Sequence, residues 1–210
     1  MKDNNISSKE EDGRKNRRSR NKKKVLDSFI ELVDERTELP STEEVASRAG
    51  VSRRSIFRYF SDIDQLVVAA YNYQIDLLQE KFPPPSPAKA GDDREKKITE
   101  YVEHLSSVYE FTASMREVFS EKGLPSDIRN KINEMRSNTL RNRLQEFFDI
   151  FLENNDDLKL ESNRSQENFF FGLESFLSPE GWDYLRGPCG LSCERAKEVW
   201  KEHLQRIFKK

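Results

Sequence analysis

The sequence has few of the residues on which most enzymes and metal sites depend. It contains two cysteines and two histidines. His104 and His203 each stand alone, and no glycine-rich phosphate loop is present, so we find no metal-ligand set and no nucleophile–base pair. We therefore expect no enzyme activity, no cofactor and no metal. Cys189 and Cys193 are expected to be reduced thiols near a loop, with a redox switch between them as the alternative.

Long apolar runs are also missing. Hydrophobic residues make up 35% of the chain and charged residues another 35%. No segment has the apolar length that a membrane span needs, and no apolar stretch follows the basic N-terminal region as it would in a signal peptide. We expect a soluble, cytoplasmic protein with no membrane partner.

The charges are unevenly distributed along the chain. The net charge is −2, but residues 13–60 carry 13 basic and 7 acidic side chains, a net of +6. Residues 61–210 carry a net of −6. A basic region attached to an acidic one orients a molecule toward a polyanion and keeps its acidic part away from it.

The N-terminal residues 1–20 show no apolar periodicity and are expected to be a disordered basic arm. Eight basic residues fall between Arg14 and Lys24. Such an arm can reach the phosphate backbone or the minor groove of a nucleic acid. The alternative is a tail that only increases solubility.

Two short helices are predicted after Pro40, which stops the preceding helix. Ser41 or Thr42 can cap the first of them. Gly50 follows where a left-handed residue ends a helix without steric cost, and Ser52 can cap the second. Helices this short are not stable alone in water, so they must pack against a third. The pattern indicates a helix-turn-helix unit.

The second short helix has a cationic outer side. Arg53, Arg54 and Arg58 remain exposed when its apolar residues are turned inward. The first turn of a recognition helix meets base edges in the major groove, where an arginine that binds guanine O6 and N7 contributes ~1–3 kcal/mol of discrimination. The alternative, a merely solvated face, is disfavoured by the glycine turn and the two caps.

The stretch from Val25 to Tyr71 resembles the DNA-binding domain of the tetracycline-repressor (TetR) family of transcriptional regulators. The resemblance is carried by VLDSFIELV, STEEVASRAGVS, SIFRYF and DIDQLVVAAY. It implies an all-α protein, with a three-helix DNA-binding domain, a helical effector domain and a homodimer. By position it implies DNA contacts from Thr42, Ser52, Arg53, Arg54, Ser55, Phe57, Arg58 and Tyr59. Among these, Phe57 could instead pack on the core.

One position departs from the family pattern. Members often carry a lysine at the start of the fourth helix, where this chain has Ile63 between Asp62 and Asp64. Two acids near a DNA phosphate would be repulsive, so this contact is not expected here.

The domain organisation follows from these patterns. The DNA-binding domain is expected over 21–66, with its two motif helices at 42–60, and a helical ligand-binding and dimerisation domain over 67–210, with a proline-rich loop at 83–91. Further helices are predicted over about 92–111, 112–121, 126–153 and 192–208. Three adjacent phenylalanines at 169–171 require a helix buried on more than one side. The last two long helices resemble the family's dimer interface.

The function expected from the sequence is a ligand-responsive transcriptional regulator. It would be a repressor that binds a pseudo-palindromic operator in double-stranded DNA as a homodimer. A small-molecule effector is implied by the resemblance, but its pocket is not placed by the sequence. The alternative is an interaction or adaptor protein with a vestigial helix-turn-helix, which would recruit partners through Pro83–Pro87 or its acidic body.

Overall fold

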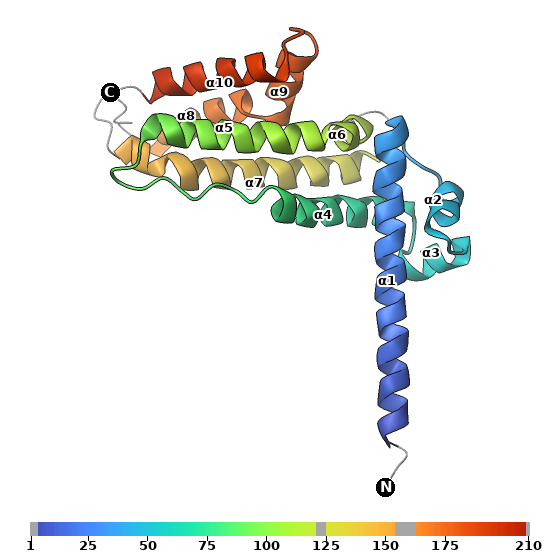
Figure 1. Ribbon diagram of the computed structural model, residues 1–210. Helices are drawn as coiled ribbons and strands as arrows, with labels where there is room; N and C mark the ends of the chain where they lie inside the picture. Colours follow the sequence, from blue (N-terminus) through green and yellow to red (C-terminus); the bar gives the residue numbers. More distant parts are fainter. Residues whose placement is uncertain (1–3, 121–124, 154–162, 209–210) are drawn as a thin grey trace. The chain divides into compact units, whose positions relative to one another are not determined.

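The computed structural model describes residues 4–120, 125–153 and 163–208, and these residues form helices and connecting segments with no β-strand. The predicted all-α fold is therefore confirmed, and the helix bounds after residue 60 agree closely with those expected. The helices are labelled in Figure 1 and comprise α1 (Asn4–Arg36), α2 (Thr42–Ala49), α3 (Arg53–Tyr59), α4 (Ile63–Lys81), α5 (Arg94–Phe111), α6 (Ala113–Ser120), α7 (Ser126–Glu153), α8 (Asn163–Phe176), α9 (Pro179–Arg186) and α10 (Cys193–Ile207).

The chain packs as two compact units, and the first comprises Met1–Leu77 and Ala113–Arg129. Its core starts from α1, where Val25, Phe29 and Val33 recur every fourth residue and are fully buried. This stripe packs against α2 and α3, which are too short to be stable without it.

Helix α6 also belongs to the first unit, where it packs against α1. Met115 and Val118 bury its apolar side. The hydroxyl of Ser114 bonds the carboxylate of Asp34 on α1; burial raises the pKa of Asp34, and this hydrogen bond opposes the shift. The sequence predicted the helix but placed it in the effector domain.

The N-terminal arm differs from its prediction. Residues 1–20 were expected to be disordered, but α1 begins at Asn4 and runs without interruption to Arg36. The expectation depended on missing apolar periodicity, which reports burial rather than helicity. Lysine and arginine are good helix formers, and no proline interrupts the segment, so the helix that starts in the core can extend beyond it.

The second unit comprises Leu78–Thr112 and Asn130–Lys210. The predicted boundary at residue 66 thus lies inside the first unit. Residues 83–89 have no regular secondary structure, as expected for the proline-rich loop, because proline lacks the amide that a helix requires.

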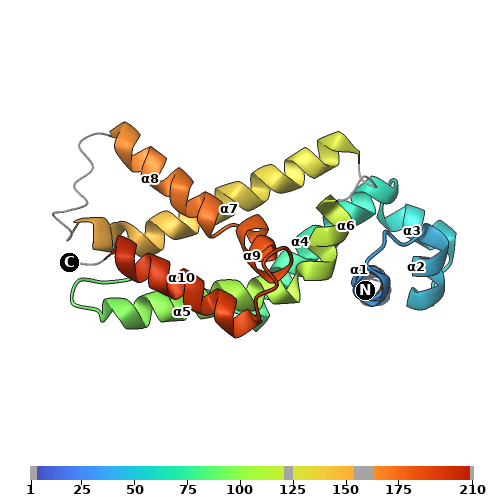
Figure 2. The same cartoon turned by 90° about the horizontal axis from the view of Figure 1, so that it is seen from above.

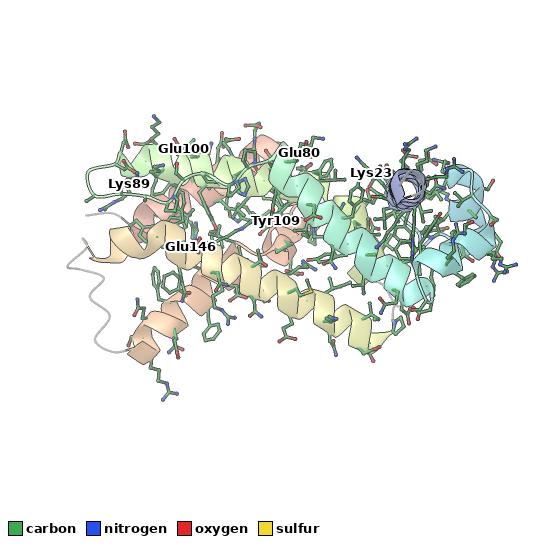
Figure 3. The ribbon with its side chains drawn as sticks, turned by 90° about the horizontal axis from the view of Figure 1, so that it is seen from below. Lys23, Glu80, Lys89, Glu100, Tyr109 and Glu146 are labelled. Atoms are coloured by element: carbon green, nitrogen blue, oxygen red, sulfur yellow. The ribbon has the colours of Figure 1, made fainter. Side chains whose placement is uncertain are left out.

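Aromatic side chains dominate the core of the second unit. Trp200 on α10 is fully buried and its ring centroid lies 4.8 Å from that of Trp182 on α9. Phe148 stacks on Phe208 with a centroid separation of 4.7 Å. Figure 2 shows α10 lying along α5, with which it makes most of its helix contacts. Tyr109, labelled inside this bundle in Figure 3, donates a hydrogen bond to the carbonyl of Leu177 at 2.9 Å.

Candidate nucleic-acid interface

Helix α2 is fixed at both ends by the residues that the sequence indicated. The hydroxyl of Ser41 accepts a bond from the amide of Glu44 at 3.3 Å, and the Glu44 carboxylate accepts one from the Ser41 amide at 2.8 Å. This reciprocal capping box satisfies amides that a helix start leaves free. Gly50 ends the helix at φ 65°, a left-handed conformation that suits glycine.

Helix α3 follows after a single turn, and a serine again caps its first turn. The Ser52 hydroxyl accepts a bond from the amide of Ser55 at 3.2 Å, and the two hydroxyls lie 2.9 Å apart. Ile56 is buried and Phe60 ends the helix with its ring in the core. With this side facing inward, the arginines of α3 are turned toward solvent.

The three arginines of α3 are exposed but differ in their partners. Arg53 forms an ion pair with Glu43 at 2.5 Å, which joins the starts of α2 and α3. Arg58 donates a hydrogen bond to the hydroxyl of Tyr59 at 3.1 Å. Arg54 has no ion-pair partner among the residues that the structure describes. Arg58 forms no ion pair with a described residue either, so both keep an uncompensated charge, and Arg54 carries it in the first turn of α3.

Phe57 is 43% exposed, which resolves the ambiguity that the sequence left. The ring faces solvent rather than the core, and the guanidinium of Arg53 lies 5.6 Å from its centroid. An exposed aromatic ring beside an arginine offers an apolar contact of the kind that thymine methyl groups accept.

The remaining predicted contacts lie at the edges of this surface. Thr42 opens α2 and is largely buried, and its hydroxyl donates to the carboxylate of Glu43 at 3.0 Å. Tyr59 is half-buried at the end of α3. Burial raises the pKa of its hydroxyl, but hydrogen bonds from Arg58 and Asn21 outweigh burial and leave this pKa lowered.

Ion pairs that the sequence did not reveal hold α2 against α1. Arg48 donates two hydrogen bonds to the carboxylate of Glu35, at 2.8 and 2.7 Å. Arg36 donates one to Glu44 at 2.7 Å, and with the Ser41 amide it lowers the pKa of Glu44 to about 2. Periodicity reports which face is apolar, not which charges meet between helices, so no sequence signal could have found these pairs.

The start of α4, where this chain has Ile63 between two acids instead of the lysine of many family members, is capped by Asp62. The carboxylate of Asp62 accepts a bond from the amide of Gln65 at 2.8 Å, and this hydrogen bond lowers the pKa of Asp62. The acid therefore caps α4 instead of leaving its amides free for a phosphate.

Comparison with known proteins supports the interpretation of α2 and α3 as a helix-turn-helix unit. Residues 40–70 match the model of the family described as bacterial regulatory proteins, tetR family. A crystal structure of a transcriptional regulator from Rhodococcus sp. Rha1 is similar, with a TM-score of 0.60 and 18% identity over 90% of this chain and 96% of that one. So is FadR from Bacillus subtilis in complex with stearoyl-CoA, with a TM-score of 0.54 and 16% identity over 86% and 96%. No curated protein matches the chain.

Residues 40–70 thus resemble bacterial regulatory proteins of the tetR family, and the chain shares its fold with two transcriptional regulators of known structure. The resemblance to the TetR family is confirmed by the match over its helix-turn-helix segment and by the shared fold.

Three further features of the described residues bear on other kinds of chemistry. No three histidine, cysteine, aspartate or glutamate side chains gather there as metal ligands would. No helix among them combines the length and apolarity of a membrane span. Cys189 and Cys193 are free, and burial raises the pKa of the Cys193 thiol, which makes its thiolate scarcer.

Proposed function

We propose that this protein is a cytoplasmic, ligand-responsive repressor that binds a pseudo-palindromic operator as a homodimer. The observation that carries the proposal is a recognition helix with two well-formed neighbours and an outer side of exposed arginines. Removing Arg54 from water is favourable only if an acceptor replaces its hydration, and guanine offers two such acceptors in the major groove.

The residues of this surface have different expected roles. Arg54 contacts base edges from the first turn of α3, and Arg58 supports binding further along the helix. Arg53 must exchange Glu43 for DNA, which costs little because both side chains are more than half exposed. Ser52 and Tyr59 bind backbone phosphates and set the register without reading sequence.

The homodimer is proposed to form through α8 and α10. Phe171 on α8 is 50% exposed in the single chain, next to the fully packed Phe170. A second subunit that covered this ring would complete the burial that three adjacent phenylalanines indicate. Two-fold symmetry would then place two α3 helices on half-sites about one helical turn apart.

A small molecule is proposed to control DNA binding. The similar FadR structure contains stearoyl-CoA, which supports a ligand for this fold without naming the one used here. To move operator occupancy from nearly full to nearly empty, the ligand must distinguish the two states by about 5.5 kcal/mol.

The test compares two charge deletions in full-length protein. Arg54→Ala should weaken binding to the operator within the gene's upstream DNA by roughly 5- to 150-fold, equivalent to ~1–3 kcal/mol, and leave the oligomeric state unchanged. Lys96→Ala removes an exposed cation of the second unit and should leave affinity unchanged. Fluorescence anisotropy measures both.

Equal affinities for wild type, Arg54→Ala and Lys96→Ala would contradict the assigned role of α3. Binding that shows no salt dependence would favour the adaptor alternative, because phosphate contacts always release counterions.

A further inference from the structure

The part of α1 that precedes its core contacts is a strongly basic surface. We refer to residues 17–24 as the basic segment. All its cations are exposed, and none forms an ion pair with a residue that the structure describes: Arg17, Arg18, Arg20, Lys22, Lys23 and Lys24. Like charges three and four residues apart repel one another on a helix. A polyanion that bound these side chains would remove this repulsion.

Contacts within the first unit fix this segment beside the recognition helix. Arg18 donates a hydrogen bond to the carbonyl of Arg58 at 3.5 Å, where the helix dipole favours a cation. The ammonium of Lys22 lies 5.3 Å from the centroid of the Phe60 ring. Asn21 bonds the hydroxyl of Tyr59. Figure 1 shows α1, in blue, passing α3 and continuing beyond it.

The helical state of the segment decides which part of DNA it can contact. An α-helix with its side chains is about 10–12 Å wide, and the minor groove of B-DNA is about 6 Å wide. A flexible arm can enter that groove, but a helix cannot. A helix can still lie along the sugar–phosphate backbone, where arginine and lysine bind without sequence preference.

We propose that the basic segment is a helical phosphate-binding surface, which contacts the DNA backbone that flanks the half-site read by α3. This inference depends on the proposed DNA-binding function and adds a second, sequence-independent contact to it. DNA phosphates neutralise the cations of the segment, so its helix becomes more stable in the complex. Recognition of the operator sequence is assigned to Arg54. The basic segment increases the affinity for DNA and the length of DNA that the protein covers.

The first test removes charge from the segment. The variant Arg17→Gln, Arg18→Gln and Arg20→Gln should bind the operator with a shallower dependence of log Kd on log salt concentration, by about 0.9 for each phosphate that the protein no longer neutralises. Its preference for operator over scrambled DNA should be unchanged. The control is Lys89→Gln, Lys96→Gln and Lys131→Gln, which removes three exposed charges from the second unit. An arginine variant with the salt slope of this control overturns the proposal.

The second test keeps every charge and breaks the helix. Ser19→Pro removes a backbone hydrogen bond inside α1, whereas Ser19→Ala preserves it. We expect Ser19→Pro to shorten the hydroxyl-radical footprint at both outer edges and to weaken binding several-fold, and Ser19→Ala to match wild type. A footprint of unchanged length for Ser19→Pro would show that a flexible arm suffices.

The third test separates phosphate from minor-groove recognition. Replacing A·T by G·C pairs just outside the half-sites changes the minor-groove surface and keeps every phosphate. Affinity should stay the same, and a clear loss would overturn the proposal in favour of groove insertion. If wild type itself binds no operator, the proposed function fails. If wild type binds and all segment variants behave like wild type, only this inference fails.

Discussion

The two units of this protein differ in the side chains that fill their cores. The first has a mainly aliphatic core around Val25, Phe29 and Val33, with helix caps and exposed ion pairs such as Arg48 with Glu35 at its surface. The second is built from interlocking rings, with Trp182, Trp200 and Tyr109 at its centre. In the first unit the caps fix the ends of α2 and α3 and leave the outer face of α3 free, which suits the proposed contact with DNA. In the second unit, rings fill the interior, and ion pairs such as those of Glu103 with Lys197 and Lys201 join its helices at the surface.

Removing a ring from the second unit should have the largest effect on stability. Trp200→Ala should lower the free energy of unfolding by about 3–5 kcal/mol, because a fully buried ring leaves a cavity that its neighbours cannot fill. Urea denaturation followed by circular dichroism measures the change. Tyr184→Ala is the control, since that ring is 62% exposed. Similar losses for the two variants would contradict the proposed core.

The glycines of the two units should respond with opposite sign. Gly50→Ala should cost about 1–2 kcal/mol, because its backbone has φ +65° and alanine is strained there although no atom lies within 4 Å. Gly172 lies within α8, and a Cβ atom built there has no atom within 4 Å. Gly172→Ala should therefore raise the free energy of unfolding by about 0.5–1 kcal/mol, because alanine loses less conformational entropy in a helix than glycine. Thermal unfolding distinguishes them, and a shift of the same sign in both would refute the difference.

Much of the first unit could be predicted from its sequence because its signals are local. The ends of α2 and α3 are set by Ser41, Gly50 and Ser52, which contact residues three or four positions away. Contacts at such short sequence separation can be predicted from the spacing of residue types. The outward direction of Arg54 followed from the same periodicity.

Long-range features could not be predicted in this way. That α6 packs on α1, and that Arg36 meets Glu44, depends on how helices cross rather than on their own patterns. The helical state of the basic segment was missed for a different reason. Apolar periodicity reports burial, and a helical segment with exposed side chains, such as residues 17–20, gives no such signal.

The effects of pH on stability occur in a different pH range for each unit. Burial and the nearby Arg143 lower the pKa of His104 in the second unit to about 4. An unfolded histidine takes up its proton near pH 6.5, so stability from the neutral ring is lost as pH falls from about 6.5 to 4. Glu44 in the first unit has its pKa lowered to about 2, so its contribution is lost only as pH falls from about 4.5 to 2.

Urea denaturation at pH 7 and pH 5 tests this separation. Wild type should lose stability between the two values, and His104→Gln should lose less. Glu44→Gln should follow wild type over this range, because its titration lies lower. A loss in His104→Gln as large as in wild type would contradict the assignment to His104.

The central claim is that exposed arginines of two α3 helices read one duplex, and methylation interference at guanine N7 tests it most directly. We predict that methylation of guanines in two symmetric half-sites prevents binding of wild type, since Arg54 needs N7 and O6 free. The same methyl groups should have little further effect on Arg54→Ala. If no guanine interferes, or if interference does not follow two-fold symmetry, the account of this protein as a dimeric reader of DNA is contradicted.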